Sequence, residues 1–211
     1  MMSDYSGFTL DQYRDALASS DPTPGGGTAA AVALAQGAAL AYMVCELTSG
    51  REKWQAGWDA ADEVRKIAEP LLIRGHELAS EDAAAFDAVM AAFRMPRESD
   101  GEKSERRTAI EVATLGAAEV PLETAICALG LLETLPPLAE YGNGNAVSDV
   151  GVSALLLSAA CRGALFNVQI NASSLPAAQS DELLAEVDSL RGRMRAVSKM
   201  VMNVVDSRLS D

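Results

Sequence analysis

The chain has 211 residues, 49% hydrophobic and 22% charged, a composition that fits a folded domain and excludes a disordered one. The formal net charge of −13 argues against nucleic acid and anionic membranes as partners. One histidine, His76, leaves little for a histidine triad or a multi-histidine metal site, so we expect neither metal nor cofactor. Three widely spaced cysteines in apolar surroundings and a polar N-terminus without a signal peptide favour reduced thiols and a cytoplasmic location.

A short helix is predicted from Thr9, which with Gln12 forms a capping-box pattern, through Ala18. The next stretch is the most informative of the chain. Pro22 and Pro24 prevent a helix from starting before them, and three glycines follow that allow other groups to approach the backbone closely. This pattern fits a tight turn and an anion-binding loop equally well.

Thr28 is placed as the N-cap of a helix over Ala29–Leu47, a run rich in Ala and Leu. The run is long enough to raise the alternative of a transmembrane helix. It is largely Ala and Gly, holds Gln36 and Glu46, and lacks flanking basic clusters, so we expect a central helix buried on most sides.

Helical periodicity continues through the rest of the chain, and no stretch alternates with period two for long. We therefore predict an all-α protein, a single domain over residues 1–211, with about seven to nine helices. Leu183 to Val204 repeat in steps of four and three, which predicts a seam that packs on the bundle or on a second subunit. The later helices are expected over Trp54–Phe93 with a kink or boundary at Pro70, Glu105–Val120, Pro121–Leu135, Val150–Ala172 capped by Ser148 or Asp149, and from Ser180 onward.

Two nearly uncharged helices each follow a glycine-containing loop, and we expect the two loops to meet at one cleft. The available chemistry is acid–base catalysis by a carboxylate at a polar site. Each candidate also has a structural interpretation: a solvated acid, an N-cap, or an amide that links two helices. The candidate carboxylates are Asp149 and Asp82, and the candidate binding residues are Pro24, Gly25, Gly26, Gly27, Arg51, Lys53, Arg106, Arg107, Asn143, Ser148, Asn167 and Asn171.

Several motifs, in one order along almost the whole chain, resemble the C-terminal domain family of formiminotransferase-cyclodeaminase, whose free-standing bacterial members include methenyltetrahydrofolate cyclohydrolases. The matching segments are PTPGGGTAAA (Pro22–Ala31), MVCELTSGR (Met43–Arg51), EDAAAFDAVMAAFRMP (Glu81–Pro96), ERR (Glu105–Arg107), EVPL (Glu119–Leu122), YGNGNAVSDVGV (Tyr141–Val152) and NVQINA (Asn167–Ala172). The chain departs from the family pattern where Glu52 interrupts the basic run of Arg51 and Lys53, and where Met95-Pro96-Arg97 replaces Leu-Pro-Lys.

The resemblance implies an all-α homodimer that acts on a one-carbon derivative of tetrahydrofolate and needs no metal or redox cofactor. Within it, Asp149 is our first choice for the acid–base group and Asp82 our second, and the basic residues are expected to hold the glutamate tail. Three functions stay open: methenyltetrahydrofolate cyclohydrolase, formiminotetrahydrofolate cyclodeaminase, and a non-catalytic helical folate-binding or assembly protein. The absence of a separate formiminotransferase domain favours the first.

Overall fold

A computed structural model describes residues 5–210, and this part of the chain is helical and has no strands. The prediction of an all-α protein is confirmed. The elements are α1 (Leu10–Leu17), α2 (Gly26–Thr48), the 3-10 helix η1 (Glu52–Gly57), α3 (Trp58–Phe93), α4 (Asp100–Leu132), α5 (Leu135–Tyr141), the 3-10 helix η2 (Gly144–Ala146), α6 (Val147–Ala172) and α7 (Ala177–Ser210).

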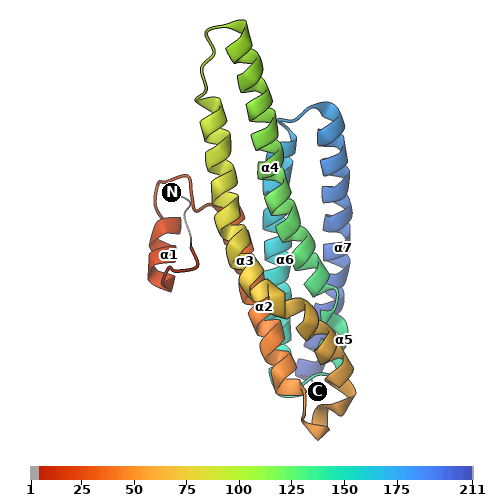
Figure 1. The fold of residues 1–211 in the computed structure, drawn as a ribbon. Coiled ribbons are helices and arrows are strands. Elements are labelled where there is room, and N and C mark those ends of the chain that lie inside the picture. Colours follow the sequence, from red (N-terminus) through yellow and green to blue (C-terminus); the bar gives the residue numbers. More distant parts are fainter. Residues whose placement is uncertain (1–4, 211) are drawn as a thin grey trace.

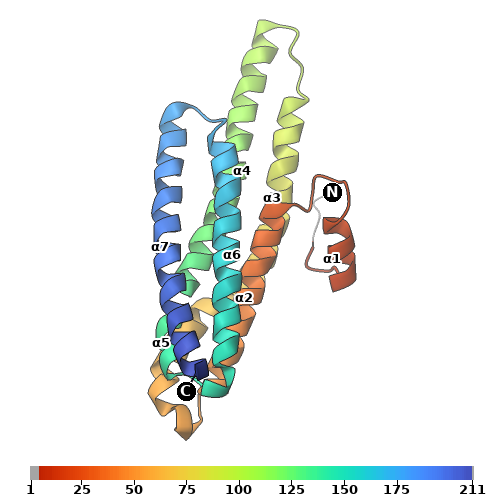
Figure 2. The same cartoon turned by 180° about the vertical axis from the view of Figure 1, so that it is seen from behind.

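Five long helices, α2, α3, α4, α6 and α7, run roughly along one axis and form an elongated bundle (Figures 1 and 2). The central helix α2 packs most extensively against α3 and α6. The short helix α1 lies beside the bundle near the N-terminal end of α2. Beyond that level, α3 and α4 continue together as a projecting arm.

Small side chains let the helices approach α2 closely. A Cβ atom built on Gly75 of α3 would lie 2.8 Å from the Cβ of Ala35 and 3.0 Å from the Ala31 carbonyl oxygen. A Cβ on Gly37 of α2 would lie 2.8 Å from Leu157 in α6. Alanine and leucine therefore build most of a dense core in a chain with only 5% aromatic residues.

The predicted seam of α7 packs on the bundle of its own chain. Leu183, Val187, Leu190, Met194 and Val201 are buried, at the expected spacing of four and three residues. The last turn differs slightly, since Val205 rather than Val204 is the buried residue.

Several predicted helix boundaries are wrong. Pro121 lies inside α4 instead of starting a new helix. Pro70 lies inside α3, which excludes the boundary and leaves the kink as the alternative. Pro136 and Pro137 belong to the first turn of α5 instead of ending a helix. The expected count of seven to nine helices assumed breaks at Pro70 and Pro121 that do not form. Within residues 5–210, six α-helices build the bundle and the short α1 lies beside it.

Pro121 shows why a proline can sit inside a helix. Proline has no N–H, so it leaves the carbonyl four residues earlier, that of Ala117, without its helical partner. The side-chain amide of Asn171 in α6 donates to this carbonyl at 2.7 Å. A tertiary hydrogen bond thus replaces the missing helical one.

The predicted helix caps are partly right. Thr9 and Gln12 form the expected capping box at the start of α1. The central helix begins two residues before Thr28, with Gly25 as its N-cap. Helix α6 begins at Val147, so Ser148 and Asp149 lie in its first turn and not at the cap.

By length and composition, three stretches of the described chain could cross a membrane: Gly26–Thr48, Asp100–Tyr141 and Gly144–Ala172. In the bundle, 50% to 56% of the most apolar window of each stretch is buried. The central helix is thus a core element of this fold, and the expectation of no membrane partner stays a prediction.

Candidate active site

A polar cavity of about 280 Å³ opens at the N-terminal end of α2. It brings together residues from the glycine loop, α3, α4 and α6. Its lining residues are Pro22, Thr23, Gly25, Gly26, Gly27, Asp82, Phe86, Val89, Ala117, Asn167, Ile170 and Asn171. Six of the residues predicted for the site, Gly25, Gly26, Gly27, Asp82, Asn167 and Asn171, therefore share one cavity, and Pro24 is buried within the same loop.

The carboxylate of Asp82 sits at the N-terminus of α2. Its Oδ2 accepts a hydrogen bond from the Thr28 hydroxyl at 3.0 Å. Burial raises the pKa of Asp82 above its ordinary value, and hydrogen bonds from the Thr28 side chain and backbone N–H act in the opposite direction. A carboxyl group with a raised pKa in a polar cavity is suited to accept and return a proton.

Gly27 is required for this arrangement. A Cβ atom on Gly27 would collide with the Asp82 carboxylate, so a side chain at this position would displace it. The absence of a side chain lets the carboxylate approach the start of α2, where unpaired N–H groups and the helix dipole stabilise negative charge.

Two asparagine side chains from α6 line the opposite wall of the cavity. The Nδ2 of Asn167 donates to the Gly163 carbonyl at 3.0 Å, and that of Asn171 to the Ala117 carbonyl at 2.7 Å. Both amide nitrogens thus donate to backbone carbonyls, which fixes the side chains. The amide oxygens remain available to accept hydrogen bonds from a ligand. Asn171 therefore both links two helices and lines the cavity.

The second glycine loop lies at the other end of α2. The backbone N–H of Asn143 donates to the Thr48 hydroxyl at 3.1 Å, and its side chain donates to the Leu47 carbonyl at 2.8 Å. Since α2 has 23 residues, the two loops are about 35 Å apart. The expectation that both loops meet in one cleft is wrong for a single chain.

Four other predicted site residues also lie near the C-terminal end of α2. Ser148 is exposed and Asp149 half-buried in the first turn of α6. Arg51 is exposed just after α2, and the Nζ of Lys53 lies 4.6 Å from the centre of the Trp54 ring.

The two arginines near the start of α4 lie on the projecting arm. Arg106 donates through Nη2 to the Phe93 carbonyl at 3.0 Å and lies over the Phe93 ring at 5.6 Å. It thereby ties α4 to the C-terminal end of α3. Arg107 is exposed on the same arm.

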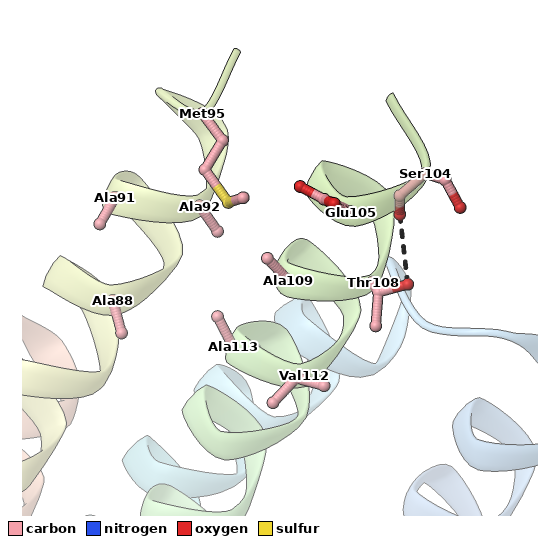
Figure 3. A pocket seen from close by; sticks show the side chains of 10 residues that line it. All are labelled: Ala88, Ala91, Ala92, Met95, Ser104, Glu105, Thr108, Ala109, Val112 and Ala113. Carbon is pink, nitrogen blue, oxygen red and sulfur yellow. Dashed lines mark hydrogen bonds between the residues drawn. The ribbon is translucent and has the colours of Figure 1, made fainter. Parts of the chain in front are cut away.

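A larger cavity, of about 820 Å³, separates α3 from α4 along the arm (Figure 3). Its walls are mainly alanine, with Met95 and Val112, and its polar groups include Thr108, whose hydroxyl bonds the Ser104 carbonyl at 3.2 Å. It contains none of the predicted site residues, and the one carboxylate that lines it, Glu105, is exposed. The smaller polar cavity is therefore the candidate active site.

Sequence reasoning missed the apolar wall of the cavity. Phe86 follows Asp82 by four residues and so shares its helix face, which is a signal that could have been read. Val89, three residues after Phe86, and Ile170, three residues after Asn167, carried the same signal. Tyr13 of α1 interacts electrostatically with Asp82. The pKa of Tyr13 is raised to about 12, mainly by burial, then by Tyr5 and then by Asp82.

Fold and cavity together define a helical-bundle protein in which one carboxylate, at the start of α2, shares a cavity with two amides. A family model described as formiminotransferase-cyclodeaminase matches residues 9–189. The chain therefore belongs to the formiminotransferase-cyclodeaminase family.

Three individual relatives agree with this assignment. A methenyltetrahydrofolate cyclohydrolase of Methylorubrum extorquens is 37% identical over 203 residues, which cover 96% of this chain and 98% of that protein. A formimidoyltransferase-cyclodeaminase of Rattus norvegicus is 32% identical over 88% of this chain, but only 34% of that protein is covered. A solved structure of a formiminotetrahydrofolate cyclodeaminase from Thermotoga maritima superposes with a TM-score of 0.84 at 27% identity, over 95% of this chain and 97% of that one.

Proposed function

We propose that this protein is a methenyltetrahydrofolate cyclohydrolase, which converts 5,10-methenyltetrahydrofolate and water to 10-formyltetrahydrofolate and a proton. The observation that carries the proposal is the Asp82 carboxylate, held at the start of α2 in a cavity that Asn167 and Asn171 also line. The relative that shares nearly its full length with this chain is named for this activity.

The substrate carries a positively charged carbon between N5 and N10. Asp82 stabilises this charge and accepts a proton from the attacking water, whose oxygen bonds to the carbon. The Asp82 carboxyl then returns that proton to N5 as the C–N5 bond breaks. The new hydroxyl releases its proton to solvent and becomes the carbonyl of the formyl group on N10. The asparagine oxygens and the glycine-loop N–H groups hold the polar ring system in place.

The test is a spectrophotometric assay that follows the loss of the methenyl absorbance. The wild-type protein should hydrolyse the substrate, and Asp82→Asn should lower kcat at least about a hundredfold. Wild-type protein that leaves the absorbance unchanged, and shows no heat on titration with a reduced folate, would overturn the enzyme assignment. Heat without turnover would instead support the non-catalytic folate-binding alternative.

A second candidate is formiminotetrahydrofolate cyclodeaminase, in which N10 attacks the formimino carbon and ammonia leaves. The similarity of the whole fold to a solved structure named for that activity favours it. Both reactions need one acid–base group and an anchored folate, so the same cavity would serve. An assay of ammonia release with formiminotetrahydrofolate, run on the same preparation, separates the two.

The protein is further proposed to act as a homodimer through one face of the bundle. Helices α2 and α6 lie antiparallel, and each carries a row of outward residues spaced four and three apart, the pattern of helices that pack on partners. On α6, Val152, Leu155, Phe166 and Ile170 are 46%, 54%, 49% and 67% exposed. This α2/α6 face consists of Ala29, Ala33, Gln36, Leu40, Met43 and Leu47 of α2 with Ser148, Val152, Leu155, Ala159, Arg162, Phe166 and Ile170 of α6.

A second copy on this face would bring the two separated sets of predicted residues together. The α6 row extends eleven residues on either side of Ala159. A two-fold axis near Ala159 therefore sets Ser148 of the partner subunit opposite Ile170, which lines the cavity. In such a dimer, Asp149 of the partner subunit approaches the cavity that holds Asp82.

A further inference from the structure

A second polar groove, of about 410 Å³, lies between α6 and α7. Two of its eight lining residues, Ala159 and Arg162, also belong to the α2/α6 face, and the five residues from α7 lie beside that face. The lining residues are Ser158, Ala159, Arg162, Met194, Arg195, Ser198, Lys199 and Met202.

Three cations and no carboxylate line this groove: Arg162, Arg195 and Lys199. This is unusual in a chain with 30 acidic and 17 basic residues. Two half-buried arginines of the bundle are ion-paired, Arg65 with Glu46 at 2.9 Å and Arg74 with Glu81 at 2.6 Å, whereas the three groove cations are exposed. Within residues 5–210, the three groove cations take part in no ion pair.

Two hydroxyl groups, of Ser158 and Ser198, also line the groove. The oxygens of Ser158 and Ser198 lie 3.0 Å apart across the two helices, and the Ser158 hydroxyl donates to the Ala154 carbonyl at 2.7 Å. The guanidinium of Arg162 lies over the Phe166 ring at 5.7 Å, which restricts the side chain. Arg195 and Lys199 are four residues apart on one helix, a spacing at which like charges repel.

We propose that this groove binds a ligand that carries two or more oxyanion groups. An anion would relieve the repulsion between the cations and form charge-assisted hydrogen bonds with the guanidinium and ammonium groups. Two sources supply this chemistry: a free anion such as inorganic phosphate, and the carboxylates of a folate with several linked glutamates. The second source rests on the proposed function, and Arg162 lies five residues from Asn167, or about 7.5 Å along the axis of α6.

The first arm of the test needs no catalytic activity. Inorganic phosphate is titrated calorimetrically into the full-length protein at low salt. The double variant Arg195→Gln/Lys199→Gln should bind at least about tenfold more weakly than wild type, since it removes two charged donors. The matched control Arg14→Gln/Lys103→Gln removes the same charge from exposed, ion-paired positions and should bind like wild type.

The second arm compares the monoglutamate and triglutamate forms of the methenyl substrate. If the tail occupies the groove, the double variant raises KM for the triglutamate about tenfold, while kcat and the monoglutamate KM keep their wild-type values. An effect on phosphate alone identifies a free anion as the ligand. If the double variant matches the control in both arms, the proposal is wrong. If the wild-type protein does not turn over the methenyl substrate, the proposed function is wrong, and the phosphate titration still tests whether the groove binds an anion.

Discussion

Asp82 is the residue on which the proposed chemistry depends, and two opposing effects set its protonation. Burial raises its pKa, whereas the Thr28 hydroxyl and backbone N–H lower it. A general base must be ionised to act, so its pKa appears as the acid limb of the pH–rate profile. The Thr28 contact therefore extends activity toward lower pH.

Thr28→Val removes the hydroxyl that donates to Asp82 and keeps the shape of the side chain. Because this hydrogen bond favours the ionised form, its loss should raise the pKa of Asp82 further and move the acid limb of kcat/KM to higher pH. The measurement is kcat/KM between pH 4 and 9. Thr108→Val, which removes an exposed hydroxyl on the arm, should leave the profile unchanged; coincident profiles for all three proteins would count against Asp82 as the base.

The same raised pKa makes a prediction about stability. The folded state holds the Asp82 proton more tightly than the unfolded state does, so this group contributes less to the free energy of unfolding as pH rises through its folded pKa. Asp82→Asn does not titrate. Its urea midpoint relative to wild type should therefore be higher at pH 7 than at pH 4, and the reverse order would contradict a raised pKa.

At the scale of the helix, the pairing of Pro121 with Asn171 shows how one element depends on another. The proline leaves the Ala117 carbonyl without a helical donor, and the Asn171 amide supplies one from α6. The α4 helix is thus continuous only because α6 lies beside it. This contact also fixes the side chain that lines the cavity.

A double-mutant cycle tests this dependence. Asn171→Leu should cost about 1–3 kcal/mol in the free energy of unfolding, because it leaves a buried carbonyl unpaired. In a Pro121→Ala background the backbone N–H is restored, and the same substitution should cost clearly less. Urea unfolding of the four proteins measures the coupling, and equal costs in both backgrounds would refute the proposed replacement.

The helices themselves were largely predictable, and their boundaries were less so. The Ala- and Leu-rich run after the glycines and the capping box at Thr9 are local signals, and both predictions are confirmed. The boundary predicted at Pro121 failed because the compensating donor is 50 residues away in sequence. Local pattern cannot reveal a partner that only the tertiary fold supplies.

At the scale of the whole molecule, the sequence correctly grouped the glycine loop with Asp82, Asn167 and Asn171, whose motifs occur in different helices. It also placed Asp149 and Asn143 in that group, but in a single chain these two residues lie about 35 Å from the glycine loop, at the other end of α2. Order along the sequence does not tell which end of an antiparallel helix a loop occupies. The proposed two-fold arrangement is what would reunite the two groups.

Mixing two inactive variants tests that arrangement. If each site needs Asp82 from one copy and Asp149 from the other, a heterodimer of Asp82→Asn with Asp149→Asn contains one intact site. After co-refolding of equal amounts, about a quarter of the wild-type activity should return. Leu155→Glu on the α2/α6 face should abolish both this recovery and the dimer, as measured by sedimentation.

Activity that stays at the level of the separate variants would place a complete site within one chain. A monomeric wild-type protein that floats with lipid vesicles would assign the α2/α6 face to a membrane instead of a second copy.

The arm formed by α3 and α4 ends in an exposed connection over residues 94–99, beyond the N-terminal end of α2 (Figures 1 and 2). Below this tip the two helices pack against each other and against the rest of the bundle. A protease that nicks the tip would therefore leave two fragments that remain associated. The same hairpin end is a convenient point at which to insert a fluorescent reporter, or to split the gene into two co-expressed halves that reassemble.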